Sequence, residues 1–171
     1  TKKVGVLGAG MMGAGIAYVS AKAGMEVVLL DMSQEGADKG KAYSEKLVAK
    51  GIKRRKVTKE KGQALLDRIK TTTDFNDLEG CDLIIEAVFE DPEIKSDVTK
   101  KAEAIIPKDT IFASNTSTLP ITGLAKAFSR EEEFIGIHFF SPVDKMPLVE
   151  IIMGKKTGNK AKAIALDYVA Q

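Results

Sequence analysis

The sequence is poor in the residues that mark cross-linked, metal-binding and membrane-spanning proteins. Its 171 residues include one cysteine, one histidine and no tryptophan. A lone cysteine, Cys81, excludes an intrachain disulfide and fits a reducing compartment, and we expect it to be a small buried hydrophobe rather than a nucleophile. No apolar run approaches the roughly 20 residues that cross a bilayer, and no signal-peptide pattern is present.

An excess of charge of either sign is also missing. Lysine and arginine number 26, aspartate and glutamate 24, and the formal net charge is +2, so the total charge does not call for nucleic acid as a partner. The length suits one substantial domain. Because the chain starts at Thr1 rather than methionine and stops at Gln171 inside an expected helix, we expect an excised piece of a longer polypeptide.

Glycine is plentiful, and three glycines form the most informative motif. Residues Val4 to Gly13 (VGVLGAGMMG) join an apolar strand to GxGxxG, which is typical of a dinucleotide-binding βαβ unit. Gly8 would permit the tight turn, Gly10 would let backbone approach a pyrophosphate, and Gly13 would let the following helix pack on the sheet. The phosphates would then lie at a helix N-terminus, which favours anions.

An acid follows the second expected strand. Met11–Ala23 reads as a helix that Gly24 ends, and Glu26–Leu30 as an apolar strand followed by Asp31. This acid is either an ordinary loop residue or the carboxylate that accepts hydrogen bonds from the adenosine ribose. A carboxylate would repel a 2′-phosphate, so NAD is favoured over NADP.

Strands and helices alternate along the rest of the chain. This pattern predicts an α/β fold, a Rossmann-type doubly wound and mostly parallel sheet with an inserted helical hairpin. Asp91 is expected to cap a helix that has Pro92 at its first position. The expected helices are 34–51, 57–68, 92–105, 118–128 and 159–171, with a helical turn at 74–78, and the expected strands are 69–72, 82–88, 110–114, 134–140 and 148–152.

A basic cluster, Lys53-Arg54-Arg55-Lys56, lies at the tip of the predicted hairpin. It lacks the interleaved aromatics of a nucleic-acid site. Two interpretations stay open, a solvated helix end and a landing place for the phosphates of an anionic substrate. Lys41 is a further candidate for such phosphates.

The one histidine, His138, is the candidate base. It lies near the end of the strand in FIGIHFFSPV, and ligands of such sheets bind at the carboxyl ends of the strands. Oxidation of a hydroxyl by hydride transfer to a nicotinamide needs a base near neutral pH. Glu150 is an acid within the apolar PLVEII, where an unpaired buried carboxylate would be costly. We expect it to orient the imidazole, and the alternative is a salt bridge from Glu150 to Lys145.

A third segment, FASNTSTL (112–119), supplies hydroxyls and an amide after another strand. Ser114, Asn115, Thr116, Ser117 and Thr118 suit turns and helix caps, and one or two of them could face a cofactor. Among them Ser117 is the better donor to a substrate oxygen, and Thr118 better suits a helix cap.

The motifs GAGMMG, VFED, SNTS, HFFSPV and LVEII, together with Asp31, occur in an order and spacing that resembles the NAD-binding domain of the L-3-hydroxyacyl-CoA dehydrogenases. The resemblance covers Lys3 to about Gly154. GAGMMGAGIA looks most like the form found in multifunctional fatty-acid β-oxidation proteins, which also carry an enoyl-CoA hydratase domain. A monofunctional 3-hydroxybutyryl-CoA dehydrogenase and a non-catalytic nucleotide-binding domain are the alternatives.

The resemblance implies reversible oxidation of a (3S)-3-hydroxyacyl-CoA with NAD. It matches His138 to the catalytic base, Glu150 to its carboxylate partner and Ser117 to a serine that contacts substrate and nicotinamide. Ser141 falls where many relatives have asparagine. The cofactor-binding positions implied in this way are Gly8, Gly10, Met12, Gly13, Asp31, Val88, Phe89, Glu90, Lys95, Asn115, Ser117 and Ser141.

The resemblance also implies parts that these 171 residues would not supply. We expect residues 1–171 to be the NAD-binding domain and a C-terminal helical domain, with a catalytic asparagine and much of the acyl pocket, to lie outside them. NAD binding should then survive in this chain while turnover is weak. The implied partners are an acyl-CoA substrate and, in an oligomeric parent, a thiolase; the implied location is the bacterial cytoplasm.

Overall fold

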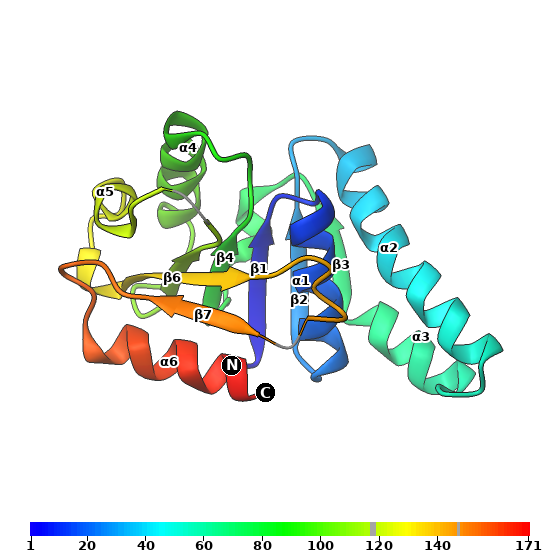
Figure 1. Ribbon diagram of the computed structural model, residues 1–171. Helices are drawn as coiled ribbons and strands as arrows, with labels where there is room; N and C mark the ends of the chain where they lie inside the picture. Colours follow the sequence, from blue (N-terminus) through cyan, green and yellow to red (C-terminus); the bar gives the residue numbers. More distant parts are fainter. Residues whose placement is uncertain (117–118, 147) are drawn as a thin grey trace.

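The computed structural model describes residues 1–116, 119–146 and 148–171. Within these ranges it forms one seven-stranded sheet in the order β3-β2-β1-β4-β5-β6-β7, with helices on both faces (Figure 1). The pairs from β3 through β6 are parallel, and β7 runs antiparallel to β6. This arrangement confirms the predicted doubly wound, mostly parallel sheet.

The strands are short and largely apolar, as expected of a sheet that is covered on both faces. They are β1 Lys3–Leu7, β2 Glu26–Leu30, β3 Ile69–Thr72, β4 Leu83–Glu86, β5 Ile111–Ser114, β6 Phe134–Phe139 and β7 Val149–Ile152.

Within the described part of the chain, helices connect all of these strands except β6 and β7. The helices are α1 Met11–Lys22, α2 Gln34–Lys53, α3 Lys59–Asp67, η1 Phe75–Leu78, α4 Pro92–Glu103, α5 Ile121–Ala125, η2 Glu131–Glu133 and α6 Asn159–Ala170. Among the described residues, none of these helices has the length and apolar character to cross a membrane.

Two apolar cores lie on opposite faces of the sheet. One contains side chains of α1, α2, α3 and α6, such as Ile16 and Ala165, together with Val6 of β1. The other contains side chains of η1, α4 and α5, such as Ala102 and Ile121, together with Phe112 of β5. Because strand side chains alternate between faces, each buried strand contributes to both cores, and this holds the carboxyl ends of the strands in fixed register.

Several helix ends follow directly from residue type. The Asp91 carboxylate accepts hydrogen bonds from the amides of Glu93 and Ile94 at 2.8 and 3.3 Å, and Pro92 opens α4, as predicted. Gly24 follows α1 with φ +98°, a conformation that favours glycine.

The predicted helix at 118–128 is wrong in extent. The observed α5 covers only Ile121–Ala125, with Pro120 at its N-cap position. Proline disfavours helical backbone in the residue before it, so the helix cannot include Leu119. Thr118, which we expected to cap this helix, lies outside the described residues.

The predicted strand at 82–88 is also too long, since β4 ends at Glu86. The Val88 amide donates to the Glu86 carboxylate at 2.9 Å instead of continuing the ladder. A side chain that competes for a backbone donor ends regular structure locally. The chain therefore turns away from the sheet two residues earlier than its hydropathy predicts.

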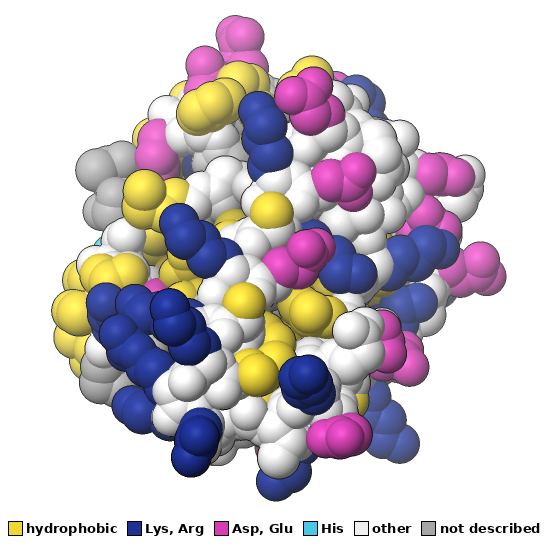
Figure 2. All heavy atoms as spheres, turned by 90° about the vertical axis from the view of Figure 1, so that its right-hand side faces the viewer, with side chains coloured by type: hydrophobic (Ala, Val, Ile, Leu, Met, Phe, Trp, Pro, Cys, Tyr) yellow, Lys and Arg dark blue, Asp and Glu magenta, His cyan; other side chains and the backbone are white. Residues whose placement is uncertain are grey.

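The inserted hairpin is present as predicted. Helices α2 and α3 pack on each other and lie beside the edge of the sheet that β3 forms (Figure 1). The cluster Lys53–Lys56 lies exposed at the turn between them, with Arg55 at φ 57°. Figure 2 shows lysine and arginine side chains gathered on the face of the molecule that this hairpin forms.

Cys81 is buried, as predicted, with 1% of its surface exposed, and burial raises the pKa of its thiol to about 11. Because the thiolate is the nucleophile, iodoacetamide at pH 8 should alkylate the folded chain at least about 100-fold more slowly than the chain unfolded in guanidinium. Mass spectrometry over time measures both rates. Equal rates would contradict the burial of this residue.

Candidate active site

Two of the three motif glycines permit close contacts between backbone segments. Gly8 has φ +99°, and a Cβ there would lie 2.7 Å from the Ala87 carbonyl oxygen. A Cβ on Gly13 would lie 1.7 Å from the Gly8 carbonyl oxygen. Neither position accepts a side chain, which confirms the turn and packing roles predicted for them.

Gly10 differs from both, because a Cβ there would have no atom of the protein within 4 Å. It precedes α1 at the N-cap position, with φ −70°, and provides no side-chain cap; the first turn also lacks an acid. The space that a side chain at position 10 would occupy is therefore open, and no side chain at the N-cap position accepts a hydrogen bond from the start of α1. This cradle fits a pyrophosphate, since a helix N-terminus favours an anion.

Asp31 follows β2 beside this cradle. Its carboxylate accepts hydrogen bonds from the amide of Met32 at 2.7 Å and from that of Ala9, in the glycine loop, at 3.3 Å. A Cβ on Gly36 would lie 2.8 Å from the Asp31 carboxylate, so α2 leaves room for that side chain. The carboxylate has further lone pairs with which to accept ribose hydroxyls.

The loops after β4 and β5 are joined by side chains. The Thr116 hydroxyl donates to the Glu90 carboxylate at 2.7 Å. The Asn115 side-chain oxygen accepts from the amide of Phe139 at 3.0 Å, which connects the end of β5 to β6. Both Thr116 and Asn115 are buried. The predicted residues Glu90 and Asn115 therefore belong to one connected set of loops at the carboxyl end of the sheet.

The segment after β6 contacts the start of α1, at the same end of the sheet as these loops. The Ser141 hydroxyl lies 3.4 Å from the Met11 sulfur at the start of α1. Val88 and Met12 are half-buried, and Phe89 is exposed by 83%. All the predicted cofactor residues that the structure describes are thus gathered at this end of the sheet, and Ser117 lies outside the described residues.

The histidine and its expected partner face each other. In the antiparallel pair of β6 and β7, His138 is the direct cross-strand partner of Glu150. The His138 Nδ1 and a Glu150 carboxylate oxygen are 3.8 Å apart, an ion pair when the imidazole is protonated. Among the described residues Lys145 makes no ion pair with Glu150. Glu150 therefore faces His138, the partner that we favoured.

Glu150 is much less buried than expected. We expected an acid within an apolar strand to be buried, but 53% of the Glu150 side chain is exposed, against 17% for His138. β7 is the last strand of the sheet, where a side chain can stay partly exposed. Glu150 therefore does not need a partner to offset burial.

Lys95 is buried and paired with an acid. The resemblance implied a lysine that contacts the cofactor, and this role stays a prediction; the Lys95 side chain is 1% exposed and its ammonium is 2.6 Å from the carboxylate of Glu86. Burial raises the pKa of the Glu86 carboxyl, an effect that Lys95 opposes. Glu86 was not among the predicted site residues, although an acid within the apolar run DLIIEAV indicates a buried charge that needs a partner.

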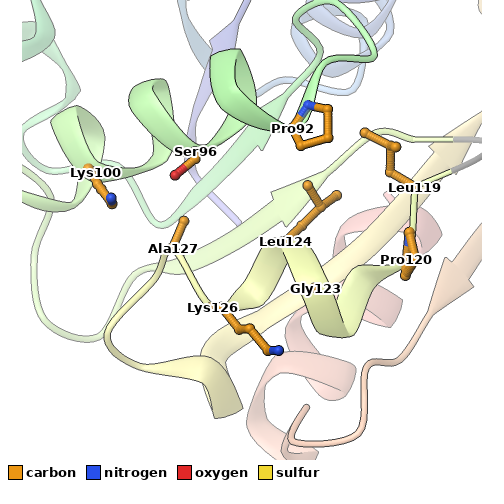
Figure 3. A pocket seen from close by; sticks show the side chains of 9 residues that line it. All are labelled: Pro92, Ser96, Lys100, Leu119, Pro120, Gly123, Leu124, Lys126 and Ala127. Atoms are coloured by element: carbon orange, nitrogen blue, oxygen red, sulfur yellow. The ribbon is translucent and has the colours of Figure 1, made fainter.

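A separate groove lies between α4 and α5 (Figure 3). It has a volume of about 380 Å³, and none of the predicted site residues lines it. Its walls include Pro92, Ser96 and Lys100 on one side and Pro120, Leu124 and Lys126 on the other.

Residues 3–171 match the family model described as "3-hydroxyacyl-CoA dehydrogenase, NAD binding domain". The chain belongs to this family. Its cofactor is NAD, and the open cradle at Gly10 with Asp31 beside it has the donors and space for that molecule. The predicted family and cofactor are confirmed.

Relatives of known description agree with this membership. The chain is 46% identical over 156 residues to the fatty acid oxidation complex subunit alpha of Psychrobacter cryohalolentis, covering 91% of this chain and 22% of that protein. The structure of (S)-3-hydroxybutyryl-CoA dehydrogenase from Ralstonia eutropha has a TM-score of 0.93 at 39% identity, over 98% of this chain and 59% of that one.

A second solved structure, 3-hydroxybutyryl-CoA dehydrogenase from Escherichia coli, has a TM-score of 0.95 at 32% identity. It is matched over 99% of this chain and 36% of its own length. The dehydrogenase fold assigned from sequence is therefore confirmed by structural comparison as well.

Two glycine variants should distinguish an effect on stability from an effect on NAD binding. Gly13→Ala should lower the free energy of unfolding by about 1–3 kcal/mol or more, because its methyl group meets backbone. Gly10→Ser should keep stability within about 0.5 kcal/mol, since serine is a good N-cap and the space is open. Yet it should weaken NAD binding at least about tenfold, because the side chain fills that space and caps the helix itself.

Urea unfolding and calorimetric titration with NAD measure the two effects. Wild-type NAD affinity in Gly10→Ser would refute the position proposed for the pyrophosphate.

Proposed function

We propose that this chain binds NAD and supplies the catalytic base for reversible oxidation of (3S)-3-hydroxyacyl-CoA to 3-ketoacyl-CoA in fatty-acid oxidation. The observation that carries the proposal is the His138–Glu150 pair, at 3.8 Å, where β6 ends and the antiparallel β7 begins. The name of the Psychrobacter relative supports the pathway. The proposal does not depend on Ser117, which keeps its predicted role as a donor to substrate and nicotinamide.

The reaction needs one proton acceptor and one hydride acceptor. NAD held beside Gly10 and Asp31 would supply the acceptor for the hydride of substrate C3. His138 accepts the proton of the 3-hydroxyl, so that a carbonyl forms at C3. With Nδ1 facing Glu150, Nε2 is the nitrogen available to the substrate, and the Glu150 carboxylate stabilises the imidazolium as it forms.

The domain assignment is part of this proposal. The chain spans 22% of the length of the curated relatives it matches. We assign NAD binding to residues 1–171 themselves and expect efficient turnover to need a C-terminal helical domain that completes the acyl pocket. Catalysis requires the reacting groups to be held together, so NAD affinity and turnover should be separable.

Coenzyme A phosphates would be held by the hairpin. Lys53, Arg54, Arg55 and Lys56 are exposed together at its tip, and Lys41 lies on α2 between that tip and Asp31. Cationic side chains grouped in this way favour a phosphorylated ligand. The relatives are described as subunits of a complex, which supports an oligomeric parent, and we propose a thiolase as the partner. Their bacterial source supports a cytoplasmic location.

A monofunctional 3-hydroxybutyryl-CoA dehydrogenase is the second candidate. Two solved enzymes of that description superpose on this chain with TM-scores of 0.93 and 0.95. Comparison of kcat/KM for four-carbon and long-chain 3-ketoacyl-CoA distinguishes the candidates.

Asp31 should set the choice of cofactor. The chain should bind NAD at least about tenfold more tightly than NADP, because a carboxylate repels the 2′-phosphate. Asp31→Asn should weaken NAD binding about tenfold and should reduce the ratio of NAD affinity to NADP affinity. Glu35→Gln, which removes an exposed charge in the first turn of α2, is the control and should change neither.

Calorimetric titration measures all six affinities. Absence of NAD binding by the wild-type chain would refute the proposed function.

His138 and Glu150 should differ in the size of their effects. In the natural polypeptide that contains this sequence, His138→Ala should lower kcat for acetoacetyl-CoA reduction by NADH about 10²–10⁴-fold. Glu150→Gln should lower kcat less and leave KM for NADH nearly unchanged, because it acts through His138. Lys145→Ala should retain wild-type kcat.

Stopped-flow absorbance of NADH measures these rates. Equal activity of wild type and His138→Ala would remove the histidine from the mechanism.

A further inference from the structure

A buried charged pair lies directly beneath the loops that form the cofactor site. Glu86 is the last residue of β4, and Lys95 comes from the first turns of α4. Their side chains are each 1% exposed, and the ammonium and the carboxylate are 2.6 Å apart. A buried pair of this kind is weak evidence for stability, because its replacement by apolar residues of similar volume often leaves the free energy of unfolding unchanged or raises it. Its position therefore calls for another explanation.

The Glu86 carboxylate connects three segments. One oxygen accepts from the Ser114 hydroxyl at the end of β5, at 2.6 Å. The other accepts from Lys95 at 2.6 Å and from the amide of Val88 at 2.9 Å. Val88 is the first residue of the predicted cofactor segment 88–90. The carboxylate thus fixes where that segment leaves the sheet.

The Lys95 ammonium also contacts the backbone of the loops after β4 and β5. Besides Glu86, it lies 3.5 Å from the carbonyl oxygen of Val88 and 3.4 Å from that of Asn115. The Asn115 side chain in turn accepts the amide of Phe139 at 3.0 Å, and Phe139 follows His138 in β6. A continuous polar path therefore runs from the cofactor segment through the ion pair to the strand that carries the base.

We propose that Glu86 and Lys95 are positioning residues, which hold the loop at Val88 and the strand at His138 in the relative placement that cofactor binding and catalysis need. They act through backbone groups and Asn115 and need not touch substrate. The inference rests on the proposed function, because it presupposes that NAD binds beside residues 88–90.

Removal of both charges tests this role apart from stability. In Glu86→Gln/Lys95→Met, the introduced amide oxygen can accept from Val88 and its nitrogen can donate to the Ser114 oxygen. No buried charge is left unpaired, so the melting temperature should remain near that of the wild type. The bonds from position 95 to the Val88 and Asn115 carbonyls are lost, however, and the loops should lose their fixed placement.

We expect this double variant to bind NAD at least about tenfold more weakly, since contacts of a charged donor are lost. In the protein without NAD, amide exchange at Val88 and Phe139, followed by NMR, should also accelerate about tenfold. The single variants should lose both affinity and stability, because each leaves a charge buried without its partner.

Thr110→Val is the matched control. Thr110 is buried and donates to the Cys81 carbonyl at 2.6 Å, at the opposite end of β5. This variant loses one buried hydrogen bond and some stability but should keep wild-type NAD affinity. Weaker binding in Thr110→Val by the same factor as in the double variant would show that lost stability alone explains the effect.

Wild-type NAD affinity and exchange rates in the double variant would overturn the inference while leaving the proposed function intact. Failure of the wild-type chain to bind NAD would refute the proposed function instead. Exchange in the wild type needs no variant: Val88 and Phe139 amides that exchange as fast as unstructured peptide would also overturn the inference.

Discussion

The contact between α1 and the turn that precedes it is the constraint on which the rest of the site depends. Gly13 approaches the Gly8 carbonyl so closely that a methyl group would have no room. This approach aims the start of α1 across the carboxyl end of the sheet, where its amides gather beside Gly10. β1 lies between β2 and β4, so Asp31 and the segment after Glu86 reach that helix terminus from either side.

The two acids that interrupt apolar strands show how position in the sheet decides the role of a side chain. Glu86 lies on a central strand and is buried with Lys95, whereas Glu150 lies on the last strand and is about half exposed. A buried carboxylate needs a partner to offset its desolvation, and this condition, which we expected for Glu150, applies to Glu86 instead. For Glu150 the partner is set by register, because antiparallel pairing brings it opposite His138. Burial and register are both properties of the assembled sheet, which explains why the sequence led to the correct pair for the wrong reason.

Some boundaries of helices and strands were predicted from the sequence and others were not. Asp91 and Gly24 were predicted correctly because a cap and a positive φ can be recognised from residue type. The end of β4 was missed because the hydropathy of the run does not show that the Glu86 side chain accepts a hydrogen bond from the Val88 amide. The burial of Lys95 was also not predicted, because only the packing of α4 on the sheet brings its ammonium beside Glu86.

The sequence by itself determined the fold class, the family and the residue types of the site, because the glycine spacing, the strand alternation and the acid at position 31 are local patterns with specific steric and electrostatic causes. Only the tertiary structure decided which side chains meet: Glu86 with Lys95, Thr116 with Glu90, and Asn115 with the amide beside His138. Those contacts join residues from different strands and loops, and their distances exist only once parallel pairing has brought the strand ends together.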